Sequence, residues 1–180
     1  MPGDSKRPRV VHQFDRSMDI EARHAPRLDR WFSERYTLRV ATDDEQRAGI
    51  DRIATDDFGE RTTLDYKCDE RARHTRNLFI ETVSNSRTRR SGWALTSSAD
   101  WLVYFAVPDQ VWMFLMRHIR SAVPTWRHCC HERAAVNAGY STFGLCVPFW
   151  RARQRVEYVA DLHHGDGPVL QARQEYLEDQ

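Results

Sequence analysis

The sequence predicts an α/β fold in a single domain, and three observations support this prediction. Apolar residues recur at helical spacing between charged ones over residues 19–36. Two β-prone runs, 49–55 and 61–67, are separated by residues with turn chemistry. Two further apolar runs, 101–107 and 111–116, have the length of buried strands.

Composition sets the broad class of the protein. The 180 residues are 41% hydrophobic and 29% charged with only 8 Gly and 7 Pro, which excludes collagen-like, low-complexity and strongly disordered chains. No apolar run approaches the ~20 residues of a membrane helix, and the charged N-terminus lacks an apolar signal-like stretch. We therefore expect a cytoplasmic protein with no membrane partner. Four cysteines, two of them adjacent, indicate reduced thiols rather than a disulfide framework.

The chain begins with a segment of different character. Residues 1–15 are polar and contain Pro, so we expect a flexible arm, with residues 16–180 forming the single domain. The first helix is expected over Asp19–Tyr36, where Pro26 should disturb or restart it.

The two β-prone runs predict a β-hairpin. If its turn centres on Phe58, Asp51 lies opposite Asp65. Side chains alternate along a strand, so Lys67 shares the face of the two acids while Tyr66 points the other way. Three ionisable groups would then cluster on one face.

The remaining elements are expected wherever turn or capping signals bound a patterned segment. In chain order they are a short strand at Leu38–Ala41, a brief helix capped by Thr42 or Asp43, a strand at Asn77–Val83, an exposed loop at Ser84–Gly92, a capped helical turn at Thr96–Asp100, a helix at Met116–Val123, a strand at Tyr140–Phe149, and a terminal loop followed by a short polar helix.

The hairpin cluster has the chemistry of a divalent-metal site. Two carboxylates held close together repel each other and are costly to keep ionised unless a cation lies between them. Mg²⁺ binds carboxylate, carbonyl and water oxygens and would resolve that conflict. The Lys67 amine could hold a water near the metal or neutralise charge developing on a phosphate. Such a set can hydrolyse a phosphodiester bond.

This pattern resembles that of the PD-(D/E)XK nuclease superfamily, which includes restriction enzymes, junction resolvases and phage or repair endonucleases. The resemblance covers about residues 19–120 and is carried by Gln46, Gly49-Ile50-Asp51, Leu64-Asp65-Tyr66-Lys67, Phe79-Ile80-Glu81 and the run 92–104. One departure is that Ile50 stands where the family has Pro before its first metal-binding Asp.

The resemblance implies a restriction-endonuclease-like core, with a central mixed β-sheet and flanking helices. It implies a Mg²⁺-dependent endodeoxyribonuclease, with Mn²⁺ as a possible substitute, that acts on DNA through a D-x(13)-D-x-K site. Its catalytic residues would be Asp51, Asp65, Lys67, Glu81 and Gln46. Its metal ligands would be Asp51, Asp65, Glu81 and the backbone carbonyl of Tyr66.

Each of these residues also has an ordinary structural interpretation. Asp65 and Lys67 could form a surface ion pair worth ~0 to 1 kcal/mol, and Asp51 could end a turn. Glu81 could be a solvated strand residue, and Gln46 could bond the local backbone.

Other acids also compete for the site. Asp56 and Asp57 are metal candidates, but their place at the tip of the turn favours turn formation. In some family members the first helix supplies a further metal-binding Glu, for which Glu21 and Glu34 are both candidates.

Two arginine-bearing loops follow the catalytic strands in sequence. We expect them to contact the phosphate backbone of the DNA partner, although a merely solvated loop would have the same composition. They carry Arg71, Arg73 and Arg76, and Arg87, Arg89 and Arg90. Cutting both strands usually requires two active sites, which suggests a homodimer. No G-x-G-x-x-G or G-K-S/T loop is present, so a nucleotide cofactor is not expected.

Two other function classes stay open. The first is a catalytically inactive domain of the same fold that binds nucleic acid or a partner protein. The second is a small zinc protein built on His128-Cys129-Cys130-His131, with Cys68, Cys146, His163 and His164 as further donors. Four contiguous residues cannot all face one ion, so packing of the cysteines is the favoured interpretation.

Overall fold

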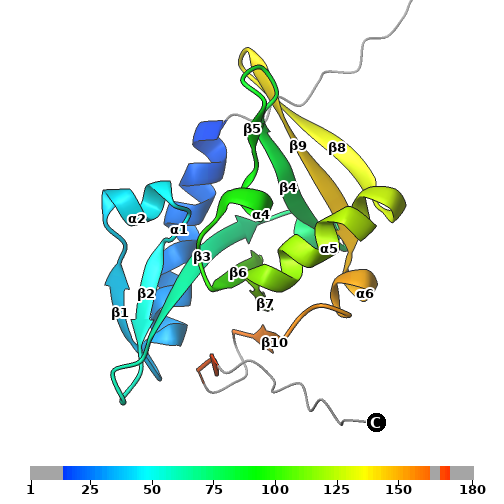
Figure 1. The fold of residues 1–180 in the computed structure, drawn as a ribbon. Helices are drawn as coiled ribbons and strands as arrows, with labels where there is room; N and C mark the ends of the chain where they lie inside the picture. Colours follow the sequence, from blue (N-terminus) through cyan, green and yellow to red (C-terminus); the bar gives the residue numbers. More distant parts are fainter. Residues whose placement is uncertain (1–13, 163–166, 171–180) are drawn as a thin grey trace, which may run out of the picture.

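In the computed structural model, which describes residues 14–162 and 167–170, the chain folds into two β-sheets flanked by helices (Figure 1). The helices are α1 (Phe14–Phe32), α2 (Asp43–Arg47), α3 (Ala72–Thr75), α4 (Trp93–Thr96), α5 (Met116–Cys129) and α6 (Phe149–Ala152). The strands are β1 (Thr37–Val40), β2 (Arg52–Thr55), β3 (Arg61–Asp69), β4 (Asn77–Asn85), β5 (Arg90–Ser91), β6 (Trp101–Ala106), β7 (Gln110–Leu115), β8 (His131–Asn137), β9 (Tyr140–Pro148) and β10 (Tyr158–Asp161).

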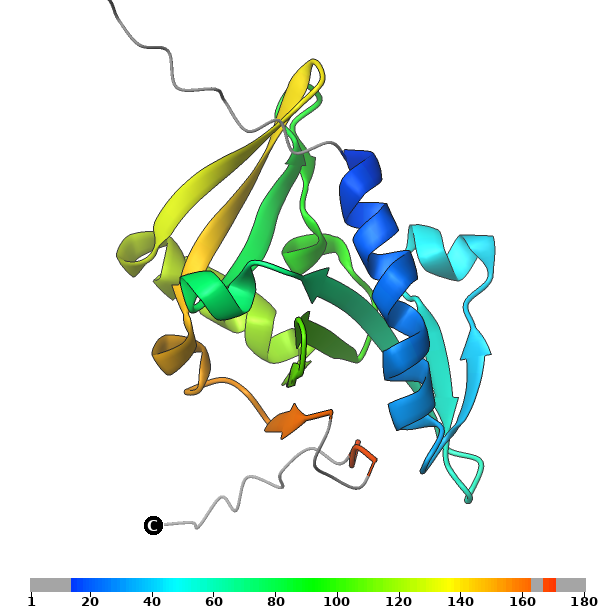
Figure 2. The ribbon, with the colours of Figure 1, turned by 180° about the vertical axis from the view of Figure 1, so that it is seen from behind.

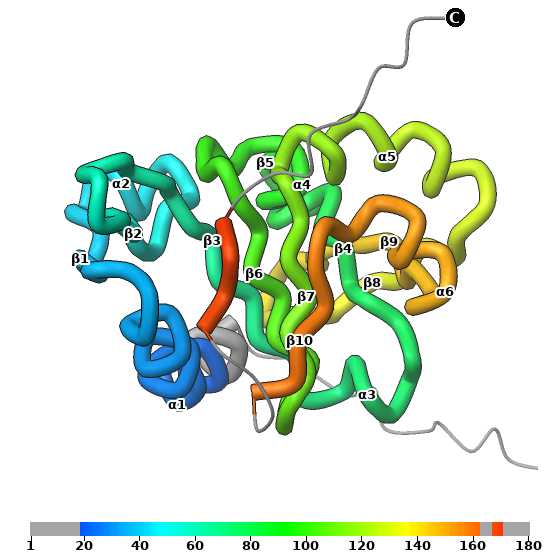
Figure 3. Tube along the Cα trace, turned by 90° about the horizontal axis from the view of Figure 1, so that it is seen from below, coloured from blue at the N-terminus to red at the C-terminus, as the bar shows by residue number. Residues whose placement is uncertain are grey.

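The larger sheet is mixed, which confirms an α/β fold with a mixed central sheet. Its six strands follow the order β1-β2-β3-β6-β7-β10, and β3 and β6 run parallel while the other pairs are antiparallel. Seen from below in Figure 3, β3, β6, β7 and β10 lie side by side. A parallel pair needs a crossover connection. Here the crossover contains α3, β4, β5 and α4.

The hairpin of β2 and β3 has the predicted register. Arg52 pairs with Leu64 and Thr55 with Arg61, so the turn is centred on Phe58. Asp51 precedes β2, and its N–H donates to the Leu64 carbonyl at 2.8 Å. The pairing therefore continues to Asp51 and places it opposite the start of the Asp65-to-Lys67 segment.

Helix α1 covers one face of the larger sheet. Its residues Leu28, Trp31 and Phe32 are buried against Leu64 and Tyr66 of β3 and their neighbours. This stripe has the spacing of one helical face. The packing of these residues against the larger sheet keeps α1 a single continuous helix.

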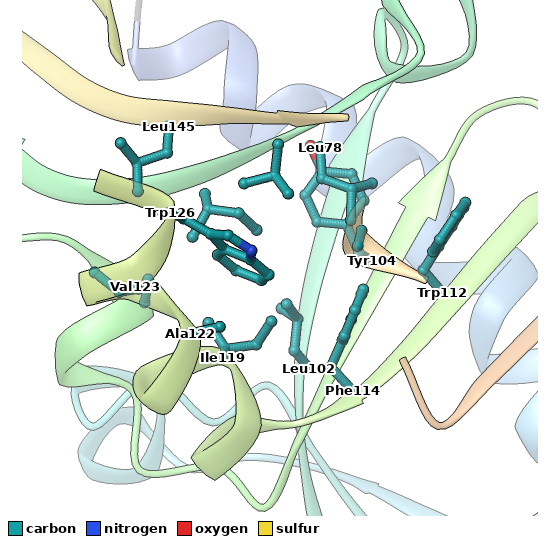
Figure 4. Close-up of a cluster of buried hydrophobic side chains, with 14 of the residues drawn as sticks. Leu78, Leu102, Tyr104, Trp112, Phe114, Ile119, Ala122, Val123, Trp126 and Leu145 are labelled. Atoms are coloured by element: carbon teal, nitrogen blue, oxygen red, sulfur yellow. The ribbon is translucent and has the colours of Figure 1, made fainter. Parts of the chain in front are cut away.

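The smaller sheet packs against the opposite face of the larger one. Its four strands follow the order β5-β4-β9-β8. Strand β4, the strand that was expected to follow the hairpin, belongs to this second sheet and not to the first. The core between the two sheets is closed by α5, and Figure 4 shows Ile119, Val123 and Trp126 of that helix pointing toward Leu102, Tyr104 and Phe114 of the larger sheet.

Several expected boundaries are wrong at the N-terminal end. Helix α1 begins at Phe14 and ends at Phe32, so the limits expected at about Asp19 and Tyr36 are displaced. Pro26 lies inside α1 on its exposed side and does not interrupt it. The flexibility expected for residues 1–13 lies outside the described residues. For α2, Thr42 is the N-cap and forms a capping box with Glu45.

Further corrections concern the later elements. The helical turn expected at Thr96–Asp100 lies earlier, at α4, and the Ser97 hydroxyl donates to the Gly49 carbonyl instead of capping a helix. The expected loop over residues 84–92 is the tip of a hairpin between β4 and β5. Helix α5 continues beyond Val123 because Pro124 is exposed and the buried stripe extends to Trp126. Strand β8 was not expected, and the terminal polar helix falls on residues outside the described range.

No helix within residues 14–162 and 167–170 has the length and apolar character needed to cross a membrane.

One buried hydroxyl links the two sheets, and its removal should destabilise the fold. Tyr104 of β6 accepts a hydrogen bond from the Phe79 N–H of β4 at 2.9 Å and donates to Asp69 at 2.7 Å. Tyr104→Phe should lower the free energy of unfolding by ~1–3 kcal/mol, because it leaves the buried partners unpaired. The matched control is Tyr66→Phe, since the buried Tyr66 hydroxyl has no hydrogen-bond partner and its loss should cost little. Urea denaturation measures both, and equal losses would contradict the assignment.

Candidate active site

The amine of Lys67 lies inside a group of carboxylates from separate parts of the chain. Its Nζ is 2.5 Å from Asp65 Oδ1, 3.8 Å from Glu21 Oε1 and 4.0 Å from Asp51 Oδ2. It also donates to the Tyr66 carbonyl at 2.7 Å. The structure therefore brings together the three residues of the predicted hairpin site and adds a fourth from α1.

The hairpin backbone positions the first two acids. Asp51 Oδ2 accepts the Tyr66 N–H at 2.7 Å, so this carboxylate is tied to the strand that carries Asp65 and Lys67. Asp65 is 1% exposed, and its Oδ2 has no hydrogen-bond partner. A buried carboxylate oxygen without a donor is costly. This oxygen is therefore a buried acceptor with no donor in hydrogen-bond geometry.

Of the two candidate glutamates, Glu21 of helix α1 is the one that lies beside Lys67. Glu21 lies on the same side of the helix as His24 and Leu28, one turn before the buried stripe begins, and this places it over the end of β3. Glu34 follows the helix and is exposed. The charged pair between Arg23 of α1 and Glu70, at 3.1 Å, ties this half of the helix to the segment after β3.

Glu81 approaches from the smaller sheet and is held by α4. Its Oε1 accepts the Trp93 N–H at 3.3 Å. Gly92 allows this approach, because a Cβ there would lie 2.5 Å from the Glu81 carbonyl oxygen. Glu81 lies within electrostatic reach of Lys67 and Asp65, but no direct contact joins it to Lys67.

The site holds more negative than positive charge. Burial raises the pKa of the Glu21 carboxyl to about 7, Lys67 opposes that rise, and Asp51, Asp65 and Glu81 add to it. Burial also raises the pKa of Asp65 despite the adjacent ammonium. For Lys67, burial would lower the pKa, but the surrounding carboxylates, Asp65 foremost, raise it above its usual value. Lys67 is therefore a stable cation.

The pKa of Glu81 is raised for the same reason as those of Glu21 and Asp65. Burial raises its pKa, and the Trp93 N–H and the charges of Lys67 and Arg90 partly offset that rise. Four carboxylates thus share one ammonium in a half-buried site, which is the electrostatic conflict that a divalent cation relieves.

The site offers oxygen donors of the kind that a hard divalent ion prefers, but those in the described residues do not form a complete ligand set. Within the described residues, no three His, Cys, Asp or Glu side chains are grouped as a complete ligand set. The Lys67 amine stands among the acids instead. The unpartnered oxygen of Asp65, the Asp51 carboxylate and the Tyr66 carbonyl are all oxygen donors of the kind that Mg²⁺ prefers.

Other predicted site residues lie outside this group. Gln46 is in α2 and its amide donates to the Ala41 carbonyl at 2.9 Å, which is the local backbone role. Asp56 accepts the N–H groups of Phe58 and Glu60, so it shapes the turn as expected.

The arginines of the two loops are separated by β4. Arg71, Arg73 and Arg76 lie at or beside α3, where Arg73 pairs with Asp109 at 3.4 Å. Arg87, Arg89 and Arg90 are exposed at the tip between β4 and β5. The charge of Arg90 acts on an acid of the site, since it lowers the pKa of Glu81 and partly offsets the effect of burial.

The cysteine and histidine run does not form a zinc site in the part of the chain that the structure describes. Cys129 and Cys130 lie at the end of α5 with their sulfurs 4.0 Å apart, and Arg151 donates to Cys129. Cys68 and Cys146 are on other strands, and His163 and His164 are outside the described residues.

Stability should fall as pH rises through the window of the Glu21 carboxyl. Its pKa is raised in the folded state, so between about pH 4.5 and 7 the unfolded chain releases this proton while the folded chain keeps it. Glu21→Gln removes that dependence. Because the side chain is 35% exposed and screened by solvent, we expect the variant to gain only about 1–2 kcal/mol at pH 8.

The gain should shrink to a few tenths of a kcal/mol near pH 4.5, where the folded wild type is protonated at this position and the unfolded chain is about half protonated. Urea denaturation at the two pH values, without divalent ions, measures it, with the exposed Glu34→Gln as control. A gain that does not depend on pH would contradict the proposed charge conflict.

Comparison of the chain with protein-family models, with curated proteins and with solved structures finds no match.

Proposed function

We propose that the protein is a metal-dependent DNA endonuclease that hydrolyses phosphodiester bonds at the Lys67 site. The observation that carries the proposal is the gathering of Asp51, Asp65, Glu21 and Glu81 around a single ammonium. A purely structural ion pair needs one acid for one base. The surplus of carboxylate in this half-buried site is unfavourable for the fold, so its presence favours a role in binding a cation.

The divalent ion would be held by Asp51, Asp65 and the Tyr66 carbonyl, with Glu21 or Glu81 completing its shell. Mg²⁺ bound there, or Mn²⁺ in its place, would lower the pKa of a bound water and polarise the phosphate. The ammonium of Lys67 now contacts Asp65 Oδ1 and the Tyr66 carbonyl, two of these donor groups. Binding of the cation is therefore expected to release the amine toward the substrate.

The raised pKa of Lys67 indicates which role this residue can have in the reaction. A permanent ammonium cannot act as the general base, but it can orient the attacking water and stabilise the negative charge that develops on the phosphate. If Glu81 completes the metal shell, Glu21 is the carboxylate beside Lys67 that can accept the proton that the attacking water loses. The fold class and the D-x(13)-D-x-K spacing agree with the resemblance to PD-(D/E)XK nucleases.

A second candidate is a nucleic-acid-binding or protein-interaction domain of the same fold without catalysis. One observation favours it, namely that Lys67 bonds two of the donor groups and so closes the site. In that case the ammonium would be a permanent replacement for the metal.

Supercoiled-plasmid nicking tests the proposal. The wild type should nick DNA with Mg²⁺ and be inactive with EDTA, and Lys67→Ala and Asp65→Asn should each lose about 100-fold or more of that activity, because each removes charge stabilisation of the transition state. Asp57→Asn, an equivalent change at an exposed turn position outside the site, is the control and should retain activity. Full activity in both site variants would exclude this assignment.

Thermal unfolding with Mg²⁺ separates the two candidates. A cation that binds the folded state raises Tm. We expect such a rise for the wild type and for Asp57→Asn, and none for Asp65→Asn. If Mg²⁺ leaves the Tm of the wild type unchanged and no DNA is cut, the non-catalytic candidate is supported.

A further inference from the structure

The smaller sheet has one face that no described helix covers. Figure 2 views this face directly, with α5 behind β4, β9 and β8, and α1 running along the side of β4. Leu78 and Ile80 of β4 point the other way into the core. The open face therefore contains the alternate residues of the same strands.

Strand register arranges these alternate residues in two rows. Directly opposed residues of antiparallel strands share a face. Glu81 pairs with Gly144 and Gly144 with Arg133, which forms one row across β4, β9 and β8. In the neighbouring row, Phe79 pairs with Cys146 and Cys146 with His131. The face is thus continuous with the acid cluster at Glu81.

The path from the cluster to β8 crosses Gly144, which the ring of Phe79 covers. A Cβ at this position would lie 2.4 Å from Cζ of Phe79, so the aromatic ring extends across the glycine. Phe79 is partly exposed there. Glu81 and Arg133 lie two strand spacings apart, about 10 Å. The residue of that row between them is Gly144, which has no side chain.

The far side of this path is positively charged. His131 and Arg133 are exposed, and Arg133 has no ion-pair partner within residues 14–162 and 167–170. Burial raises the pKa of the Cys146 thiol, the nearby charges of Arg133 and Arg71 lower it, and the charge of Asp69 adds to the rise. On the two rows described above, Glu81 is the only carboxylate.

We propose that this open face binds the DNA strand that is cut, with the strand crossing β4, β9 and β8 so that Arg133 contacts a phosphate next to the one held at the acid cluster. This inference rests on the proposed endonuclease function and adds the substrate path to it. In this arrangement Arg133 binds a phosphate of the DNA backbone, and a base can stack on the partly exposed ring of Phe79.

Charge and shape favour nucleic acid over a protein partner. The face combines guanidinium and imidazole groups with one aromatic ring, whereas a protein interface of this size would need an apolar centre. The guanidinium group of Arg133 suits phosphate oxygens. The arginines of α5 cannot serve the same strand, because α5 packs on the opposite face of the sheet.

Fluorescence anisotropy with a labelled DNA duplex and its single strand tests the path, with Ca²⁺ replacing Mg²⁺ so that binding is measured without cleavage. Arg133→Ala should weaken binding about 5- to 10-fold and reduce the salt dependence by about one phosphate contact. Arg133→Lys should keep most of the salt dependence. The matched control is Arg117→Ala on exposed α5, which should change neither quantity.

The inference is overturned if Arg133→Ala and Arg117→Ala have equal effects, or if the wild type binds neither DNA. Because anisotropy does not require catalysis, a specific effect of Arg133 together with no Mg²⁺-dependent cleavage would support the path and reject the nuclease. Cleavage that is unaffected by Arg133→Ala, with unchanged affinity, would support the nuclease and reject the path.

Discussion

The proximity of several carboxylates to one buried ammonium is the constraint around which the candidate site is built. Lys67 keeps its charge because Asp65, Glu21 and Asp51 surround it. Burial raises the pKa values of Glu21 and Asp65, and the one ammonium only partly offsets that rise. Burial increases both effects, since charges interact more strongly away from water. Such an arrangement lowers stability and is therefore expected where a positive ligand binds.

This charge cluster forms only when three parts of the fold pack together. The hairpin provides the two aspartates and the lysine, α1 provides Glu21, and the smaller sheet provides Glu81. Their relative positions depend on packing contacts away from the charges, such as the Tyr104 hydroxyl between the sheets and the close approach at Gly92. The site is accordingly a property of the whole core, and a substitution in that core can affect it without touching any charged group.

Local patterns in the sequence were sufficient for the hairpin and for several other elements. The turn at Phe58 fixes the register by chain geometry alone, so the position of Asp51 opposite Asp65 follows from counting residues. The strands at residues 101–106 and 110–115 were predicted for a similar reason, because 101–106 and 111–115 are apolar runs of strand length. Expectations failed where tertiary packing overrides local signals, as at Pro26 and Pro124, which lie on exposed sides of continuous helices.

By itself, therefore, the sequence determined the α/β class, the hairpin and the Asp51, Asp65 and Lys67 cluster, since these depend on side-chain alternation and short turns. Only the tertiary structure decided that β4 joins a second sheet, that Glu21 and not Glu34 reaches the amine, and that a face with Arg133 continues from Glu81. Those contacts join residues far apart in the chain. Their geometry depends on how buried surfaces pack, and no local pattern encodes that.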